Sequence, residues 1–258
     1  MLQMMGLKSL HDPLYDSFPR LEIDAKTLPA VLPKKVDYTY AYPVVDDQNG
    51  IGSCVAYAAR KLFEFYHARR KGQHELISAR ALYASAKALY GANDHTDDGL
   101  NVSDGLNVLK QFYVNESDYA SVPNNSSDFP SYLIEAPYDL RKSDFLVQSF
   151  VTVAPSVSEA RKALYKHGPI LIGTAWPNEW MNIGIDGLLP TVGLTLDGGH
   201  CINIIGYDDE KIMADGTHGG FKIMNNWTTA WGDAGFAWLP YSLEGLQFFP
   251  TDLFTAKL

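Results

Sequence analysis

A helical repeat of apolar residues begins just after Ser53. Apolar side chains recur three and four positions apart at Val55, Ala58, Ala59, Leu62, Phe63 and Tyr66, and Gly72 follows. This spacing predicts a helix with one apolar face that ends near Gly72. Residues 78–89 and 102–112 show similar patterns and predict two further helices. Ser103 and Asp104 are candidate caps for the second of these.

The pattern changes in the second half of the chain. Residues 156–166 predict one more helix, and residues 169–175 form an apolar run typical of a buried strand. Three β-rich segments follow at residues 201–207, 220–225 and 235–239, with glycine and aspartate between them. Residues 115–137 are rich in Asn, Ser and Pro and predict a long surface connection. Helices followed by strands predict an α+β fold whose halves face each other across a cleft.

The first 43 residues differ from the rest. Prolines at positions 13, 19, 29, 33 and 43 prevent a long helix, and no apolar period is sustained. We therefore expect residues 1–43 to form an arm or a short leader, either structural or inhibitory. The domain proper is expected to span 44–258, with 44–140 mainly helical and 141–258 mainly β.

Composition and charge narrow the class of protein. The chain has 258 residues, 46% hydrophobic and 20% charged, which is typical of a globular protein. A formal charge of −9 without a long basic run argues against nucleic-acid binding. No apolar run is long enough to cross a bilayer, and the start of the chain lacks the pattern of a signal peptide. The default expectation is therefore a cytoplasmic protein that does not bind membranes.

Cys54 is the first candidate for chemistry. It follows Gly52 and Ser53 at the start of the first predicted helix. The partial positive charge at a helix N-terminus stabilises a thiolate, and a nearby imidazolium lowers the thiol pKa further. A free cysteine is also commonly a small buried apolar residue, so Cys54 alone does not establish a nucleophile.

His200 and Asn225 strengthen the case for a nucleophile. His200 follows Gly198 and Gly199 at the entrance of a predicted strand, where it can take the thiol proton and return it to a leaving amine. Cys201, its neighbour, should point to the opposite face and into the core. The side-chain oxygen of Asn225 can fix the imidazole tautomer, although the adjacent Asn226 leaves this assignment ambiguous by one position.

Gln48 completes the candidate set. It lies six residues before Cys54, where its amide can donate to an oxyanion together with the Cys54 backbone N–H. Cysteine, histidine and asparagine in this order are what a thiol nucleophile needs when its base and orienting amide come from the other half of the fold. His200 lies 146 positions after Cys54, within the roughly 130–150 typical of such enzymes.

Three motifs together resemble the papain-like cysteine peptidase family. They are Gln48 with Gly52-Ser53-Cys54, then Gly199-His200-Cys201 with Gly206-Tyr207, then Asn225-Asn226-Trp227 with Trp231-Gly232 and Gly235-Phe236. The likeness runs from about residue 32 to 240. It implies a papain-like α+β fold with a helical left subdomain, an antiparallel β-barrel-like right subdomain and the active-site cleft between them.

The resemblance also assigns roles to individual residues. Cys54 becomes the nucleophile, His200 the base, Asn225 the orienting amide and Gln48 the oxyanion donor. Gly99 resembles the glycine whose backbone pairs with an extended peptide. Gly173 falls where the family lines its main specificity pocket, and we expect Gly199 and Trp227 to contact substrate as well.

Departures from the family pattern are equally specific. Ile51 stands where the family usually has a cysteine, so the disulfide it would form is missing. Val55 replaces the aromatic residue after the nucleophile, and Asn226 replaces a serine. Two glycines before His200 resemble the bacterial and viral branch of the family.

The expected function is a cysteine endopeptidase that acts on extended peptide or protein substrates through a Cys54 thioester. Two alternatives stay open at this stage. The same triad can carry out transpeptidation or deamidation, or the chain can be a catalytically silent peptide-binding module. We expect no cofactor or metal. The one candidate metal loop begins at Asp94 but has Gly105 at its twelfth position, where a calcium loop needs a bidentate Glu.

Overall fold

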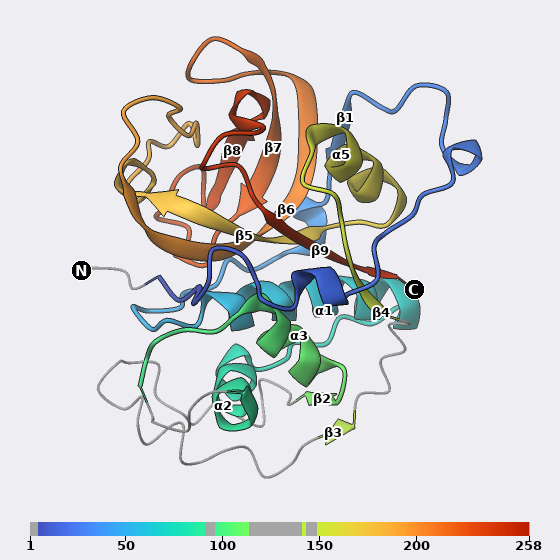
Figure 1. Ribbon diagram of the computed structural model, residues 1–258. Helices are drawn as coiled ribbons and strands as arrows, with labels where there is room; N and C mark the ends of the chain where they lie inside the picture. The colour runs from blue at the N-terminus through green and yellow to red at the C-terminus, as the bar shows by residue number, and fades with distance from the viewer. Residues whose placement is uncertain (1–4, 91–95, 114–140, 143–148, 258) are drawn as a thin grey trace.

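A computed structural model describes residues 5–90, 96–113, 141–142 and 149–257 of the chain. One half contains three helices, α1 (Cys54–Lys71), α2 (Ala79–Tyr90) and α3 (Val102–Leu109). The other half is an antiparallel sheet with α5 (Val157–Lys166) packed against it. Figure 1 shows the sheet above α1, with α2 and α3 below it. The α+β class predicted from the sequence is confirmed, and the predicted connection over 115–137 lies outside the described residues.

The sheet has seven strands in the order β4-β9-β5-β6-β7-β8, and β1 pairs with β6 beside this path. Their bounds are β1 (Lys35–Asp37), β4 (Ser149–Thr152), β5 (Ile170–Pro177), β6 (Leu196–Ile212), β7 (His218–Met224), β8 (Phe236–Pro240) and β9 (Asp252–Lys257). Two short strands, β2 (Phe112–Tyr113) and β3 (Arg141–Lys142), pair separately. The register of β5 and β6 places Thr174 opposite His200 and Gly173 opposite Cys201.

The helix α1 is buried on nearly all sides because it lies between the other helices and the sheet. Its residues from Cys54 to His67 are all buried, and the Asn203 side chain on β6 donates to the Ala58 carbonyl at 3.0 Å. Gly72 ends the helix in a left-handed conformation with φ of 71°, which a residue without Cβ adopts readily. The predicted end of this helix is therefore confirmed.

Three charged residues of α1 are buried and compensated. Arg60 and Lys61 bind Asp46 at 2.7 and 3.0 Å. Glu64 accepts the Ile77 backbone N–H at 3.0 Å, and burial raises the pKa of its carboxyl. Buried charges are costly unless paired. Since Asp46 lies two residues before Gln48, this network also fixes the chain that leads to Cys54.

Two details of α3 differ from expectation. The helix ends at Leu109 and not near residue 112. Its N-cap is Asn101, whose backbone N–H donates to the Asp104 carboxylate at 3.0 Å. Ser103 lies inside the helix, where its N–H donates to Asp12 at 2.6 Å. The cap prediction was therefore wrong for Ser103, since a remote aspartate satisfies its N–H.

Candidate active site

Cys54 is the first residue of α1, in the first helical turn as predicted, and Ser53 holds the N-cap position. The cysteine is fully buried. Burial raises the pKa of its thiol to about 12, although backbone hydrogen bonds from Cys201, Gly6 and Val55 act in the opposite direction. The sulfur therefore lies against the backbone of Cys201, one residue from His200. In this closed environment the thiol is neutral at physiological pH.

His200 is held by Asn225. The imidazole Nε2 lies 2.8 Å from the Asn225 Oδ1. Because that oxygen can only accept, Nε2 carries the proton and Nδ1 is left as the acceptor. Among the described residues Nδ1 is buried without a hydrogen-bond partner. Burial lowers the pKa of His200 to about 4, against the opposing effect of the Asn225 hydrogen bond.

Asn225 and Asn226 make different contacts. Asn225 directly follows strand β7, and its side chain bonds His200, whereas the Asn226 side chain donates to the Cys201 carbonyl at 3.2 Å. Cys201 itself is buried in the core shared with the helices, and both cysteines are free thiols.

Trp227 joins the histidine to the glutamine. Its ring stacks on His200 with centroids 4.7 Å apart and an interplanar angle of 27°. Its indole N–H donates to the Gln48 Oε1 at 3.1 Å. The edge of Trp176 also contacts His200, with centroids 4.7 Å apart. These rings exclude water from the imidazole and account for its lowered pKa.

Gln48 is fully buried. Its amide Nε2 donates to the Ile51 carbonyl at 2.8 Å, and its backbone N–H donates to the Asn226 carbonyl at 2.9 Å. These bonds tie the loop before Cys54 to the loop after β7. Gln48 and Cys54 lie on one chain segment, and His200 and Asn225 lie on two others. Hydrogen bonds and ring contacts join these segments at the boundary of the two halves.

The N-terminal segment passes through this boundary. Figure 1 shows the dark blue chain running between the sheet and the helices. The Gly6 carbonyl accepts the Leu100 N–H at 2.9 Å, and the Lys8 backbone N–H donates to the Leu100 carbonyl at the same distance. The Leu7 N–H donates to the Gly199 carbonyl at 3.2 Å. Leu7 and Leu100 form a parallel bridge.

Three of the four residues predicted to contact substrate meet this segment. Gly99 lies against Gly6, Gly199 bonds Leu7, and a Cβ on Gly173 would lie 3.2 Å from the Leu7 side chain. The fourth, Trp227, lies on His200. The chain therefore fills with its own backbone the place that the sequence assigned to a peptide.

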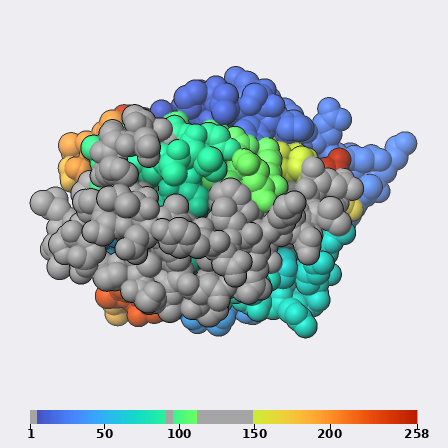
Figure 2. Space-filling view, turned by 90° about the horizontal axis from the view of Figure 1, so that it is seen from below, coloured from blue at the N-terminus to red at the C-terminus, as the bar shows by residue number. Residues whose placement is uncertain are grey.

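Buried carboxylates anchor the segment. Asp252 on β9 accepts the Asp12 N–H at 2.5 Å and lies 2.6 Å from the His11 ring nitrogen. Asp12 in turn accepts the Ser103 N–H, and Lys8 binds Asp98 at 2.8 Å. In the space-filling view the blue N-terminal residues lie beside the green residues of α3 (Figure 2). Sequence reasoning missed these anchors because isolated aspartates carry no periodic signal.

Asp97 is a further residue that the sequence did not single out. Its carboxylate accepts the Gly52 N–H, at 2.9 and 3.0 Å to the two oxygens. It also accepts the Tyr83 hydroxyl at 2.8 Å. Asp97 therefore connects the loop before Cys54 to helix α2.

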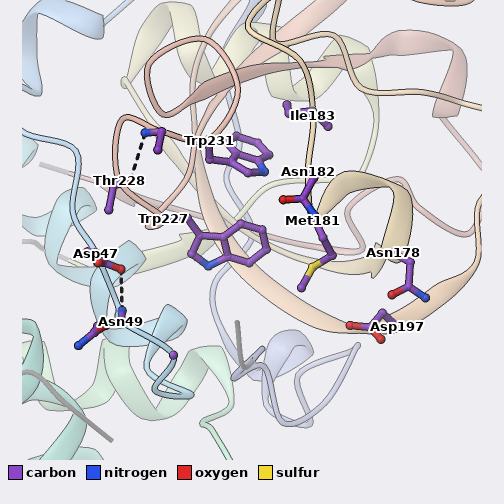
Figure 3. Close-up of a pocket in the computed structure, with 12 residues that line it drawn as sticks. Asp47, Asn49, Asn178, Met181, Asn182, Ile183, Asp197, Trp227, Thr228 and Trp231 are labelled. Carbon is purple, nitrogen blue, oxygen red and sulfur yellow. Dashed lines mark hydrogen bonds between the residues drawn. The ribbon is translucent and has the colours of Figure 1, made fainter. Parts of the chain in front are cut away.

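A pocket of about 610 Å³ lies beside Trp227, which forms part of its wall (Figure 3). Trp227 and Trp231 form apolar walls with Met181, and Asp47 and Asp197 add two carboxylates. Asp47 directly precedes Gln48. The pocket is lined by Trp227, which stacks on His200, and by neither Gly99 nor Gly173.

Neither a metal site nor a membrane span is found in the part of the chain that the structure describes. No three His, Cys, Asp or Glu side chains within these ranges converge as metal ligands would. Likewise, none of the described helices combines the length and apolar character needed to span a bilayer.

Comparison with solved structures supports the fold. Xylellain, a cysteine protease from Xylella fastidiosa, matches with a TM-score of 0.73 at 24% identity, over 100% of this chain and 99% of that chain. Digestive procathepsin L2 from Tenebrio molitor larval midgut matches with a TM-score of 0.75 at 15% identity, over 99% of this chain and 78% of that one. Procathepsin B S9 from Trypanosoma congolense has a TM-score of 0.73 at 15% identity, over 99% and 87%.

Sequence comparison gives the family directly. No curated protein matches the chain significantly. The model of the papain family of cysteine proteases, however, matches residues 32–245, most of the chain. The chain therefore belongs to the papain family of cysteine proteases and is a cysteine-type peptidase, a hydrolase that acts on peptide or protein substrates.

Proposed function

We propose that this chain is an endopeptidase in which Cys54 is the nucleophile and His200 the general base and acid. The observation that carries the proposal is the His200–Asn225 bond through Nε2, which leaves Nδ1 as a buried proton acceptor. The strand that carries His200 lies against the Cys54 sulfur through the backbone of Cys201. Nucleophile, base and orienting amide are thus held by neighbouring elements, as thiol catalysis requires.

The proposed reaction has two steps. The Cys54 thiol passes its proton to the His200 Nδ1 as the sulfur attacks the peptide carbonyl carbon and a C–S bond forms. The C–N bond then breaks as His200 passes that proton to the leaving amine. Water then loses a proton to His200 and attacks the thioester carbonyl, and the C–S bond breaks to release the acid and the thiol. We assign the Cys54 N–H and the Gln48 amide to stabilise the negative oxygen in both steps.

The structure describes the site in a closed state. Burial keeps the thiol and the imidazole neutral, with pKa values of about 12 and about 4. A thiolate–imidazolium pair needs solvation or a polar substrate at the same place. We infer that residues 5–12 restrain the enzyme, because Gly6 and Leu7 occupy the peptide-binding position and Asp252, Asp98 and Ser103 hold them there.

Internal cleavage of a protein tests the proposal. The full chain is incubated with an unfolded unrelated protein, and the fragments are identified by mass spectrometry. Cys54→Ala is the matched control, since it removes the nucleophile and keeps a small buried side chain. Cleavage at internal bonds by the wild type alone supports an endopeptidase. Equal fragments from both proteins, or none from the wild type under any activating condition, would exclude it.

Transfer of the acyl group to an amine is the second candidate. The pocket beside Trp227 lies next to the ring that stacks on His200, so we propose that it holds the amine in place of water. Water and amine compete for one thioester, so the product decides between them. Product masses with and without an added amine, such as a glycine amide, distinguish hydrolysis from transpeptidation.

A further inference from the structure

Asp97 holds together the parts of the site that must stay in register. Its carboxylate accepts the Gly52 N–H, two residues before the nucleophile. It lies two residues before Gly99, the predicted peptide-pairing glycine. The Tyr83 hydroxyl of α2 donates to the same carboxylate. One side chain thus joins the nucleophile loop, the peptide-binding segment and a helix behind them.

The packing around this contact is tight. A Cβ on Gly52 would lie 2.8 Å from the Asp97 Oδ1 and 3.4 Å from the Gly99 backbone nitrogen. Gly52 therefore approaches both the carboxylate and the Gly99 segment as closely as a residue without a side chain can. Tyr83 is fully buried, so the hydroxyl that orients Asp97 has a fixed position.

The sequence shows why such a tie is needed. Ile51 stands where a disulfide would otherwise fasten the nucleophile loop, and both cysteines of the chain are free. Ile51 packs in the core and makes no covalent cross-link. Hydrogen bonds to a charged group are stronger than those between neutral groups. The Asp97 carboxylate accepts two, one from the Gly52 N–H and one from the Tyr83 hydroxyl.

We propose that Asp97 is a positioning residue of the peptidase, which holds the Gly52-Ser53-Cys54 loop at a fixed distance from the substrate backbone at Gly99. The inference rests on the proposed function, because it assigns Asp97 to the same reaction. Asp97 does not touch substrate and acts through Gly52.

The charge of Asp97 gives this role a distinct signature. It raises the pKa of Cys54, as a nearby negative charge must. In the part of the chain that the structure describes, Cys201 on β6 and Tyr83 on α2 also interact electrostatically with Cys54. Around Asp97 itself, burial raises its pKa while the Gly52 and Tyr83 hydrogen bonds and the Lys87 charge lower it, and Asp98 raises it.

Two substitutions separate position from charge. Asp97→Asn keeps an oxygen that can accept the Gly52 N–H and removes the charge. Asp97→Ala removes both. Asp186→Asn is the control, because it removes one carboxylate from an exposed loop of the other half, where Asp186 accepts the Leu188 N–H.

The experiment measures kcat and KM of the full chain for one peptide between pH 4 and 10. We expect Asp97→Ala to lower kcat/KM by about tenfold or more, as expected for a displaced nucleophile. We expect Asp97→Asn to lose less of kcat/KM. Because its side chain no longer raises the Cys54 pKa, the acidic limb of the pH profile should move down by about half a pH unit. Asp186→Asn should leave the limb in place.

Other outcomes would overturn the proposal. If Asp97 only stabilises the fold, both variants lower the unfolding temperature but leave the acidic limb and kcat/KM per folded molecule unchanged. If Asp97→Ala does not fold, Asp97→Asn decides alone. The pH dependence of Cys54 alkylation by iodoacetamide needs no turnover. If Asp97→Asn shifts the pH profile of alkylation while the chain has no peptidase activity, the role of Asp97 is supported and the proposed function fails. If the alkylation profile does not shift, the role of Asp97 is excluded.

Discussion

The backbone of Gly6 lies directly against that of Gly52, two residues before Cys54. A Cβ built on Gly6 would overlap the Gly52 carbonyl group, and one built on Gly99 would overlap the Gly6 carbonyl oxygen. Neither overlap involves a flexible side chain that could move aside. The N-terminal segment can therefore occupy the site only because position 6 carries no side chain.

Gly6→Ala should open the site. The added methyl group cannot fit against Gly52, so we expect Gly6 and Leu7 to leave the cleft and the initial rate of peptide cleavage to rise by about tenfold, the effect of roughly 1.4 kcal/mol on the closed state. Gly184→Ala is the control, since its Cβ would meet only the Asp186 side chain. Equal rates for wild type, Gly6→Ala and Gly184→Ala would show that the segment does not restrain the enzyme.

Asn225 and Asn226 should differ in their effect on turnover. Asn225→Ala removes the acceptor that fixes the His200 tautomer, so we expect kcat to fall by about a hundredfold, within the range of general acid–base effects. Asn226→Ala removes only the bond to the Cys201 carbonyl and should cost much less. Steady-state kinetics of the two variants provide the measurement. A larger loss in Asn226→Ala would reverse the assignment of the orienting amide.

Most of the secondary structure could be predicted from the sequence. The helix after Ser53, the helix that begins near residue 156 and the strand after Pro169 have strong periods, and their predicted positions agree with α1, α5 and β5. Strand β6 is much longer than expected, from Leu196 to Ile212, since its glycines and aspartates resemble turns. Strands β1, β4 and β9 went unpredicted because they are short or lie next to proline-rich chain.

The site was predictable only where residue type and order carry the chemistry. Cys54, His200, Asn225 and Gln48 were predicted because each residue type suits a step of thiol catalysis and together they form a motif. Asp97, Asp12 and Asp252 were not found, since an aspartate that binds a backbone N–H has no characteristic spacing. Their partners lie 45, 91 and 240 positions away, and only the folded chain brings them together.

Acid should weaken the closed state through His200. Its pKa is about 4 in the structure and about 6.5 when exposed. The unfolded or opened chain therefore binds a proton first as the pH falls. The contribution of the neutral, buried His200 ring to the stability of the closed state is complete above pH 6.5. It is lost between pH 6.5 and 4, on the order of 3 kcal/mol in all.

Thermal unfolding between pH 4 and 7.5 checks this expectation. The midpoint of the wild type should fall more steeply below pH 6.5 than that of His200→Gln, which has no titrating ring. Asp97 and Asp252, whose pKa values burial raises, are present in both proteins and cancel in the comparison. Parallel curves would mean that His200 is not buried as a neutral group.

The pocket beside Trp227 should favour a basic residue on the amine side of the scissile bond. Asp47 and Asp197 supply negative charge, and the Trp227 and Trp231 rings can contact both an aliphatic stem and a cation. We expect kcat/KM to be higher for lysine than for glutamate at this position. Each of Asp47→Asn and Asp197→Asn should reduce the preference by about threefold, as expected for a partly exposed ion pair.

A matched peptide series measures this preference, with only the one residue varied. Asp186→Asn removes a carboxylate of the same half of the protein that does not line the pocket, and it should leave the preference unchanged. Added salt should reduce the preference for lysine. A preference for glutamate, or one unaffected by either pocket variant, would contradict the assignment.

The most direct test of the account is the site of covalent labelling by an epoxide inhibitor selective for activated thiols. The account predicts one adduct on the folded full chain, located by mass spectrometry at Cys54, and none at Cys201. Labelling should be faster in Gly6→Ala and nearly absent in His200→Ala. A folded chain that is labelled at Cys201 instead, or is labelled equally well without His200, would contradict the claim that Cys54 and His200 form the catalytic pair.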